Sequence, residues 1–526
     1  MVDKNFCWKL QVEILTPVHI GTGRELFFER DYIMDGHGQI LVVDQNALFE
    51  ELATSEGELS EYISSKDIPL SKLVEGVSGQ EKGYKLGMLG NRPISKRITE
   101  KDQEGRETAI REQIKDGFSQ PYLPGSSIKG AIRTALLAKM VNDQGLEAIK
   151  NYLPKPCDHK LPSKGNADNR LMRALFSGNA REESYHDFLR ALHVSDVIFA
   201  ENGLAIADIH YLNLVGGAAQ TTWKIQGGKV GRKPIDDWKD EKATLTFNEV
   251  LKPTSISISD FTLQIDHFLL KEQNRQLGWQ NIPDFSDFDK LKTILNEHAR
   301  NRLESEITFF REYKLEQVRK QCEQLRNKVI RDDKSCYLQI GWGNGWRGMT
   351  GEWMNKQTEE EMRKCFGLGK VSKKACNPEE EGNKNKRNFY ELNYPIFPKT
   401  RRLVVANHQP CIPLGWIRLF PQETHLALQF SREETCRVEE TQLSPEEKAL
   451  HDIQQAFEQA KNSKEKQGGP LSNLLDKFLK EAHSWEPTRR EQLAALSETI
   501  YTALKWWGNS EKKKQKQARL NQLKEK

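Results

Sequence analysis

The most constraining feature of the sequence is a regular alternation of apolar and polar residues near its start. The apolar members are Trp8, Leu10, Val12 and Ile14. Side chains of a strand alternate between its two faces, so a period of two predicts a half-buried β-strand. A short apolar run at residues 40–43 and a helical pattern at residues 46–52 follow. This order of strand, strand and helix favours an α+β domain.

The length of 526 residues, 37% of them hydrophobic, is enough for two or three domains with separate cores. Strand alternation returns at residues 244–250 and 255–270, and a long helical pattern follows at residues 285–331. We therefore predict a first domain at residues 1–262 and a second at residues 263–440. Residues 81–116, which include Arg111, are polar and charged and are expected to form an insertion.

The chain changes character after residue 440. Ser444 followed by Pro445 is a typical helix start, and glycines 468 and 469 with Pro470 separate two helical patterns. Residues 441–526 are predicted to form a helical extension. Its basic tail at residues 512–516 is expected to be disordered in isolation, because like charges repel.

The net charge of +4 is unevenly distributed. Residues 505–526 carry eight Lys or Arg and two Glu, which gives +6 and leaves −2 for the rest of the chain. Any nucleic-acid surface in the body must then be a local patch. Mean hydropathy is −0.70, and no stretch approaches ~18 consecutive apolar residues. With no signal-peptide pattern at the start, the expected location is the cytoplasm.

Eight cysteines are scattered along the chain, and none belongs to a C-x-x-C pair. The only suggestive group is Cys157 with His159, which lacks the second clustered pair of a zinc site. We expect neither a metal nor another cofactor.

The second glycine-rich segment, residues 121–133, places a turn before a helix. Gly125 ends the turn, Ser126 or Ser127 is expected to cap the helix, and Lys129 and Arg133 share one helical face. Free N–H groups at such a start favour a phosphate. The alternative is an ordinary capped helix with two solvated cations.

Two further glycine-rich segments carry aromatic or titratable side chains. His19 lies on a strand that ends in glycines, where it is either structural or in contact with a nucleotide. Trp342 and Trp346 lie in the loop at residues 341–348, where they either stack on unpaired bases or anchor the core.

Three cations occur within four residues after Pro398. They are Lys399, Arg401 and Arg402. They form either a solvated run or a set of phosphate contacts.

These segments resemble the RAMP superfamily of CRISPR-associated proteins. The opening strand at residues 16–23, the P-G-S-S-x-K-G element at residues 124–130 and the strand at residues 192–196 are similar to RAMP motifs. Residues 341–346, 397–402 and 413–416 look most like the fifth-subunit family of type III-A Csm effector complexes.

The resemblance implies two ferredoxin-like, RRM-like domains with the helical extension beyond them. It implies a non-catalytic subunit that caps the 3′ end of the CRISPR guide RNA (crRNA) and aids its maturation in antiviral defence. The implied partners are the guide RNA, other RAMP subunits and a recruited nuclease, without a membrane. The expected RNA-binding residues are His19, Gly21, Gly23, Arg24, Gly125, Ser126, Ser127, Lys129, Arg133, Trp342, Trp346, Arg347, Lys399, Arg401 and Arg402.

Two other readings remain open. The chain could be a metal-independent CRISPR repeat endoribonuclease with His19 as general acid or base, or a scaffold that touches only protein. Catalysis is not assigned to Asp31, because its surroundings look like a second strand rather than a catalytic loop.

Overall fold

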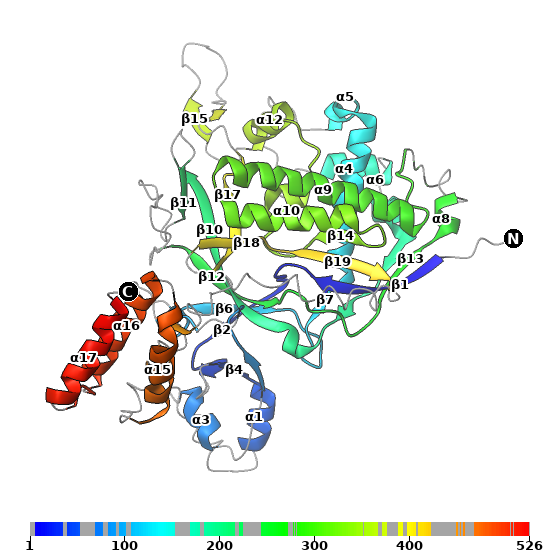
Figure 1. The fold of residues 1–526 in the computed structure, drawn as a ribbon. Coiled ribbons are helices and arrows are strands. Elements are labelled where there is room, and N and C mark those ends of the chain that lie inside the picture. Colours follow the sequence, from blue (N-terminus) through cyan, green and yellow to red (C-terminus); the bar gives the residue numbers. More distant parts are fainter. Residues whose placement is uncertain are drawn as a thin grey trace. The chain divides into compact units, whose positions relative to one another are not determined.

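The protein is described by a computed structural model (Figure 1). The structure describes residues 6–34, 39–52, 69–76, 83–90, 94–100, 107–152, 169–178, 183–215, 220–224, 243–271, 277, 279, 281–350, 352–366, 371–375, 388–392, 397–406, 409–421, 449–450, 453, 456–457, 468–485, 487–504, 506–508 and 510–524. The chain divides into two compact units, Met1–Phe430 and Ser431–Lys526.

The first unit contains an antiparallel five-stranded sheet that joins the two ends of that unit. Its strand order is β14-β19-β1-β13-β8. The predicted first strand is the central one, β1, which pairs with β13 on one side and β19 on the other. The strands are β1 (Phe6–Ile14), β8 (Leu192–Val194), β13 (Phe261–Ile265), β14 (Cys336–Gln339) and β19 (Trp416–Pro421).

A larger sheet of seven strands has the order β18-β17-β10-β12-β6-β2, with β11 paired to β10. Strand β6 holds Arg111 and lies between β12 and β2, so the expectation that residues 81–116 form only an insertion is wrong there. A strand of five residues is too short to show a clear alternation of apolar and polar residues, so the sequence did not reveal it. The strands are β2 (Gly21–Phe27), β6 (Ala109–Gln113), β10 (Leu204–Val215), β11 (Gln220–Trp223), β12 (Leu245–Leu251), β17 (Thr400–Ala406) and β18 (Gln409–Ile412).

The described part of this unit also contains three small sheets. One pairs β3 (Tyr32–Met34), β4 (Ile40–Val43) and β5 (Gly83–Leu86), and two helices, α1 (Gln45–Leu52) and α3 (Leu70–Gly76), pack on it. The others pair β7 (Tyr122–Leu123) with β9 (Val197–Ile198), and β15 (Val371–Ala375) with β16 (Asn388–Leu392).

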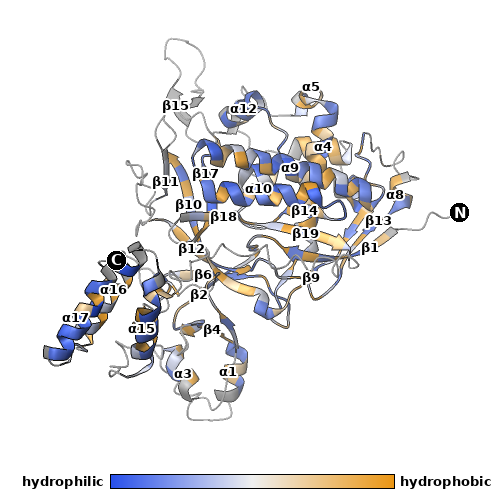
Figure 2. Cartoon of the chain, in the orientation of Figure 1, coloured by the Kyte–Doolittle hydropathy of each residue, from blue (hydrophilic) through white to orange (hydrophobic). Residues whose placement is uncertain are grey.

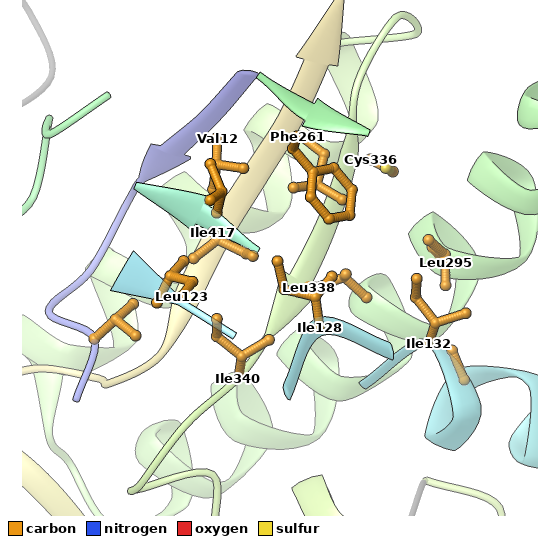
Figure 3. Close-up of a cluster of buried hydrophobic side chains, with 14 of the residues drawn as sticks. Val12, Leu123, Ile128, Ile132, Phe261, Leu295, Cys336, Leu338, Ile340 and Ile417 are labelled. Atoms are coloured by element: carbon orange, nitrogen blue, oxygen red, sulfur yellow. The ribbon is translucent and has the colours of Figure 1, made fainter. Parts of the chain in front are cut away.

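The main core lies between helix α4 and the five-stranded sheet. Ile128 and Ile132 of α4 are fully buried; Ile128 lies beside Leu338 of β14, and Ile132 lies beside Leu295 (Figure 3). The long helical pattern at residues 285–331 is confirmed as two helices, α9 and α10, which lie side by side (Figure 1). Their outward faces are largely hydrophilic (Figure 2).

The helices of the first unit, beyond α1 and α3, are mostly short. They are α4 (Gly125–Gln144), α5 (Leu146–Ile149), α6 (Asn169–Ser177), α7 (Glu183–His186), α8 (His267–Lys271), α9 (Phe288–Glu312), α10 (Glu316–Arg331), α11 (Gly345–Thr350) and α12 (Lys356–Phe366).

The second unit is helical and has a core of its own. It contains α15 (Pro470–Glu481), α16 (Pro487–Ala503) and α17 (Ser510–Lys524). Buried residues from all three, such as Leu475, Leu493 and Leu520, belong to one cluster, and Trp506 is buried in it. Within the chain the basic tail is part of α17, and Leu520 of that helix is buried in the same core. Disorder of the tail in isolation stays a prediction. The predicted helix start at Ser444 lies outside the described residues.

The mixed α+β class is confirmed. The two ferredoxin-like domains and the boundary near residue 262 stay predictions. Within the described ranges, no helix is long and apolar enough to cross a membrane.

Candidate functional site

Trp342 lies against one face of the seven-stranded sheet. It follows β14 and packs against aliphatic side chains of that face while staying partly exposed. The bed beneath it includes Ala207 and Ile209 of β10, Val250 of β12 and Val404 of β17. A tryptophan held in this way presents an aromatic surface on a rigid sheet.

Two arginines flank the Trp342 ring. The guanidinium carbon of Arg402 lies 4.3 Å from the ring centroid, and that of Arg111 lies 5.2 Å from it. Arg111 also has a loose ion pair with Glu25 at 3.9 Å. In the described part of the chain no carboxylate pairs with Arg402, and its guanidinium carbon also lies 5.7 Å from the centroid of the Tyr211 ring. Its charge is therefore not compensated by a carboxylate of any described residue.

Tyr211 extends the aromatic surface along β10. Its ring centroid lies 6.3 Å from that of Trp342 at an interplanar angle of 84°. The exposed Lys224 lies 5.7 Å from the Tyr211 ring. We call the group of His19, Arg111, Tyr211, Trp342 and Arg402 the Trp342 cluster. Cations around accessible aromatic rings are the combination that single-stranded nucleic acids bind.

His19 is the buried member of the Trp342 cluster, and its ring meets the Trp342 ring edge-on with centroids 6.1 Å apart. Its Nδ1 donates to the carbonyl oxygen of Glu249 at 2.7 Å, and its own carbonyl accepts from the backbone N–H of Trp342 at 2.8 Å. Burial lowers the pKa of His19 to about 4; the Glu249 hydrogen bond opposes this, while Arg111 and Lys115 lower it further. The imidazole is therefore neutral at pH 7.

Acidification is expected to destabilise the fold through His19. The pKa is about 4 in the folded protein and 6.5 in its ordinary state. The unfolded chain thus binds the proton more readily between these values. The stability contributed by neutral His19 is complete above pH 6.5 and is lost as the pH falls toward 4, by on the order of 3 kcal/mol. Urea unfolding at pH 7 and pH 4.5 should show a smaller loss for His19→Gln than for the unchanged chain; equal losses would contradict this account.

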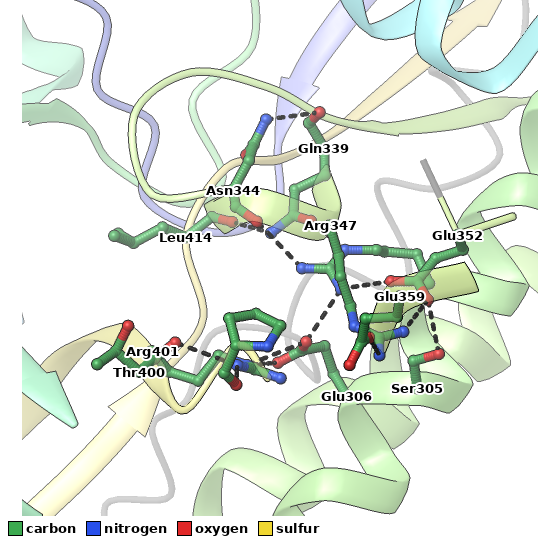
Figure 4. Close-up of polar contacts among 12 residues, drawn as sticks. Ser305, Glu306, Gln339, Asn344, Arg347, Glu352, Glu359, Thr400, Arg401 and Leu414 are labelled. Carbon is green, nitrogen blue, oxygen red and sulfur yellow. Dashed lines mark hydrogen bonds and ion pairs between the residues drawn. The ribbon is translucent and has the colours of Figure 1, made fainter. Parts of the chain in front are cut away.

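The loop that carries Trp342 is fixed from both sides. Gly341 has a φ of +74°, and a Cβ there would lie 2.6 Å from the His19 carbonyl oxygen, so only glycine permits the approach. On the other side, Arg302 of α9 donates to the carbonyl oxygen of Asn344 at 3.0 Å. Asn344 donates in turn to the carbonyl oxygen of Gln339 at 3.2 Å (Figure 4).

A buried ion-pair network surrounds Arg302. Its guanidinium contacts Glu352 at 2.7 Å and Glu306 at 3.0 Å. Arg401 joins it through Glu306 at 2.8 Å, and Arg347 joins it through Glu352 at 3.0 Å (Figure 4). Burial alone would raise the pKa of Glu306, but Arg401 and Arg302 hold it below its ordinary value. Arg347 and Arg401, expected at the RNA, thus have carboxylate partners within the protein.

The start of α4 differs from the prediction. The N-cap position is Pro124, and neither Ser126 nor Ser127 provides a side-chain cap. The Gly125 N–H donates to the Asp196 carboxylate at 2.7 Å, so an internal anion already occupies this helix start. A Cβ on Gly125 would lie 2.7 Å from the Ser195 carbonyl oxygen, so the glycine allows close packing there.

Lys129 and Arg133 also have partners inside the protein. Lys129 Nζ donates to the Leu192 carbonyl oxygen at 2.7 Å, and Arg133 pairs with Asp187 at 2.6 Å. The two motifs at residues 124–130 and 192–196 are thus fastened together. Lys129 and Arg133 therefore face other parts of the protein, and replacing both with alanine is expected to disturb folding.

The remaining expected RNA-binding residues lie on β2, in α11 and beside β17. Arg24 pairs with Asp31 at 2.7 Å on β2, near the exposed Gly21 and Gly23. The Trp346 ring packs on Phe397, with centroids 4.9 Å apart. The carbonyl oxygen of Lys399 accepts from Leu214 N–H at 3.2 Å.

No group of three or more His, Cys, Asp or Glu side chains that could hold a metal is found in the ranges described. Cys157 and His159 lie outside those ranges.

Comparison with known proteins gives one family and a set of distant relatives. The sequence profile of the RAMP superfamily matches residues 11–347. A Csm5 protein of the CRISPR system of Methanocaldococcus jannaschii is 24% identical over 429 residues, which cover 80% of this chain and 90% of the relative.

Two solved structures are similar at lower identity. A chain of a cryo-EM Csm–crRNA–target RNA ternary complex of a type III-A CRISPR-Cas system is 22% identical, with a TM-score of 0.49, over 78% of this chain and 99% of that one. The crystal structure of T. onnurineus Csm5 is 20% identical, with a TM-score of 0.47, over 77% and 99%. Both scores are below 0.5, so the family assignment rests on the sequence matches.

Proposed function

The chain belongs to the RAMP superfamily and is similar to type III-A Csm5 proteins, and from this premise we propose that it binds CRISPR guide RNA as a non-catalytic subunit of a type III, Csm-like effector complex. The similarity to a Csm5 protein extends over four fifths of the chain. It supports a role as an effector subunit.

The observation that carries the RNA-binding proposal is the Trp342 cluster. Trp342 and Tyr211 offer aromatic surfaces on which unpaired bases stack, and Arg402, Arg111 and Lys224 supply positive charge beside them. Base stacking and phosphate contacts depend little on which base is bound, so they supply affinity for single-stranded RNA in general. The overall charge of the body is near zero, so this local patch matters more than the net charge.

Within the complex, the chain holds the 3′ region of the guide RNA and aids its maturation. Other RAMP subunits are its protein partners, and a recruited nuclease performs the trimming. These finer roles are supported by the resemblance of residues 341–346, 397–402 and 413–416 to the fifth-subunit family.

The endoribonuclease alternative depends on His19, and its surroundings are unfavourable for acid–base catalysis. A buried imidazole with a pKa of about 4 is a weak base and is not protonated at neutral pH. Its Nδ1 is already used by a backbone carbonyl. His19 is better placed to position Trp342 than to transfer protons.

Incubation of the purified full-length chain with end-labelled single-stranded repeat RNA, with and without EDTA, tests the proposal. We expect a gel shift with intact RNA in both conditions. Cleavage in EDTA that His19→Ala abolishes would support the endoribonuclease, and absence of any RNA binding would favour a protein-only scaffold.

A further inference from the structure

A row of polar side chains that have no hydrogen-bond partner among the described residues lies along β12. Thr244 precedes the strand, and Thr246 and Asn248 follow at every second position. The hydroxyls of both threonines and both amide atoms of Asn248 are buried and unpaired. Asn248 is 0% exposed. We call these three residues the β12 row.

The β12 row belongs to the face that carries the Trp342 cluster. Directly paired residues of neighbouring strands lie on the same face. Asn248 pairs with Ala207 of β10 on one side and with Arg111 of β6 on the other. Thr246 pairs with Ile209, and both Ala207 and Ile209 belong to the aliphatic bed against which Trp342 packs. The row therefore lies beside or beneath the Trp342 ring.

Buried polar groups without hydrogen-bond partners lower the stability of the folded protein. Nearly all buried polar groups in folded proteins are hydrogen-bonded, and leaving one unpaired costs about 1–3 kcal/mol. Apolar residues at these three positions would remove that cost and would match the aliphatic neighbours Ile209, Val250 and Val404. Consecutive unpaired groups on a single face indicate a polar partner that enters from that face.

We propose that the β12 row recognises the edge of one unpaired RNA base that stacks on Trp342. This inference rests on the proposed RNA-binding function and adds a specificity-determining site to it. A base edge presents donors and acceptors side by side, which the Asn248 amide matches with one of each. The flanking guanidinium groups of Arg111 and Arg402 neutralise the adjoining phosphates.

Entry of the base requires the Trp342 ring to tilt. Asn248 is sealed in this structure, whereas Trp342 is partly exposed. The Trp342 backbone is held by the His19 carbonyl, so the side chain can turn while the loop stays in place. The ring then covers one face of the inserted base.

The test compares the full-length chain with Asn248→Leu and Thr246→Val in binding to oligo(A), oligo(C), oligo(G) and oligo(U) by fluorescence anisotropy. We expect the unchanged chain to prefer one base. In each variant the ratio of affinities for the preferred base and the other bases should be about tenfold smaller, which corresponds to the loss of one or two hydrogen bonds. Melting temperatures should not fall, because an apolar group of similar shape replaces an unpaired polar one.

Gln11→Leu is the matched control, because the Gln11 side-chain oxygen is also buried and unpaired but lies on β1 of the other sheet. It should leave base preference unchanged. The inference is overturned if the variants keep the base preference of the unchanged chain, or if the unchanged chain has no preference. Either result would mean that only water forms hydrogen bonds with the β12 row. If the unchanged chain binds none of the four oligonucleotides, the proposed function itself is refuted.

Discussion

Replacing Arg302 with methionine is expected to lower the free energy of unfolding by about 3–5 kcal/mol, the usual cost of removing one partner from a buried ion pair. The Arg302 side chain is 6% exposed, and those of Glu352 and Glu306 are 5% and 10% exposed. Methionine fills similar space but removes the positive charge that Arg302 places beside both carboxylates. It also removes the donor to the Asn344 carbonyl, which holds the Trp342 loop.

Arg319→Met is the control for this prediction. Arg319 of α10 also pairs with two glutamates, Glu316 and Glu323, but at the surface, where Glu316 is 57% exposed. Exposed pairs contribute about 0–1 kcal/mol. Urea unfolding followed by circular dichroism distinguishes the two variants; an Arg302→Met loss as small as that of Arg319→Met would show that the network is not structural.

Replacing Trp342 with alanine is expected to weaken binding of single-stranded RNA by about 5- to 150-fold. Aromatic stacking on one base contributes about 1–3 kcal/mol. Arg402→Ala should lower affinity less at high salt than at low salt. It should flatten the slope of log affinity against log salt by about 0.7, the effect of one lost phosphate contact on a single strand.

Trp8→Ala is the matched control for Trp342→Ala. Trp8 is also partly exposed and aromatic, but it lies on β1 of the five-stranded sheet, 6.0 Å from the Phe288 ring. Anisotropy titrations at two salt concentrations measure both variants. An equal loss in both would indicate a general effect on folding, and no loss in Trp342→Ala would remove the ring from the RNA-binding surface.

The sequence predicted those parts of the fold that local periodicity determines. The alternation at residues 8–14 became the central strand β1, and the pattern at residues 285–331 became α9 and α10. The helix α4 was predicted, but the group that accepts from its first N–H was not, because that group is the carboxylate of Asp196, 71 residues away in sequence. A cap supplied from such a distance leaves no local signal.

The candidate site was predictable only where its residues lie in short local motifs. Glycines and aromatic residues in short motifs pointed to His19 and Trp342, and a run of cations pointed to Arg402. Arg111 and Tyr211 were missed as site residues, because their shared face depends on the register of β6, β12 and β10. Pairing between distant strands is not readable from one sequence.

Photo-crosslinking of the full-length chain to guide-type RNA containing 4-thiouridine, followed by mass spectrometry of the crosslinked peptides, tests the central claim most directly. If RNA lies on the Trp342 cluster, crosslinks should map to the peptides that contain Tyr211 and Trp342. Crosslinks confined to residues 125–133 of α4 or to α17, with none at Tyr211 or Trp342, would contradict the account.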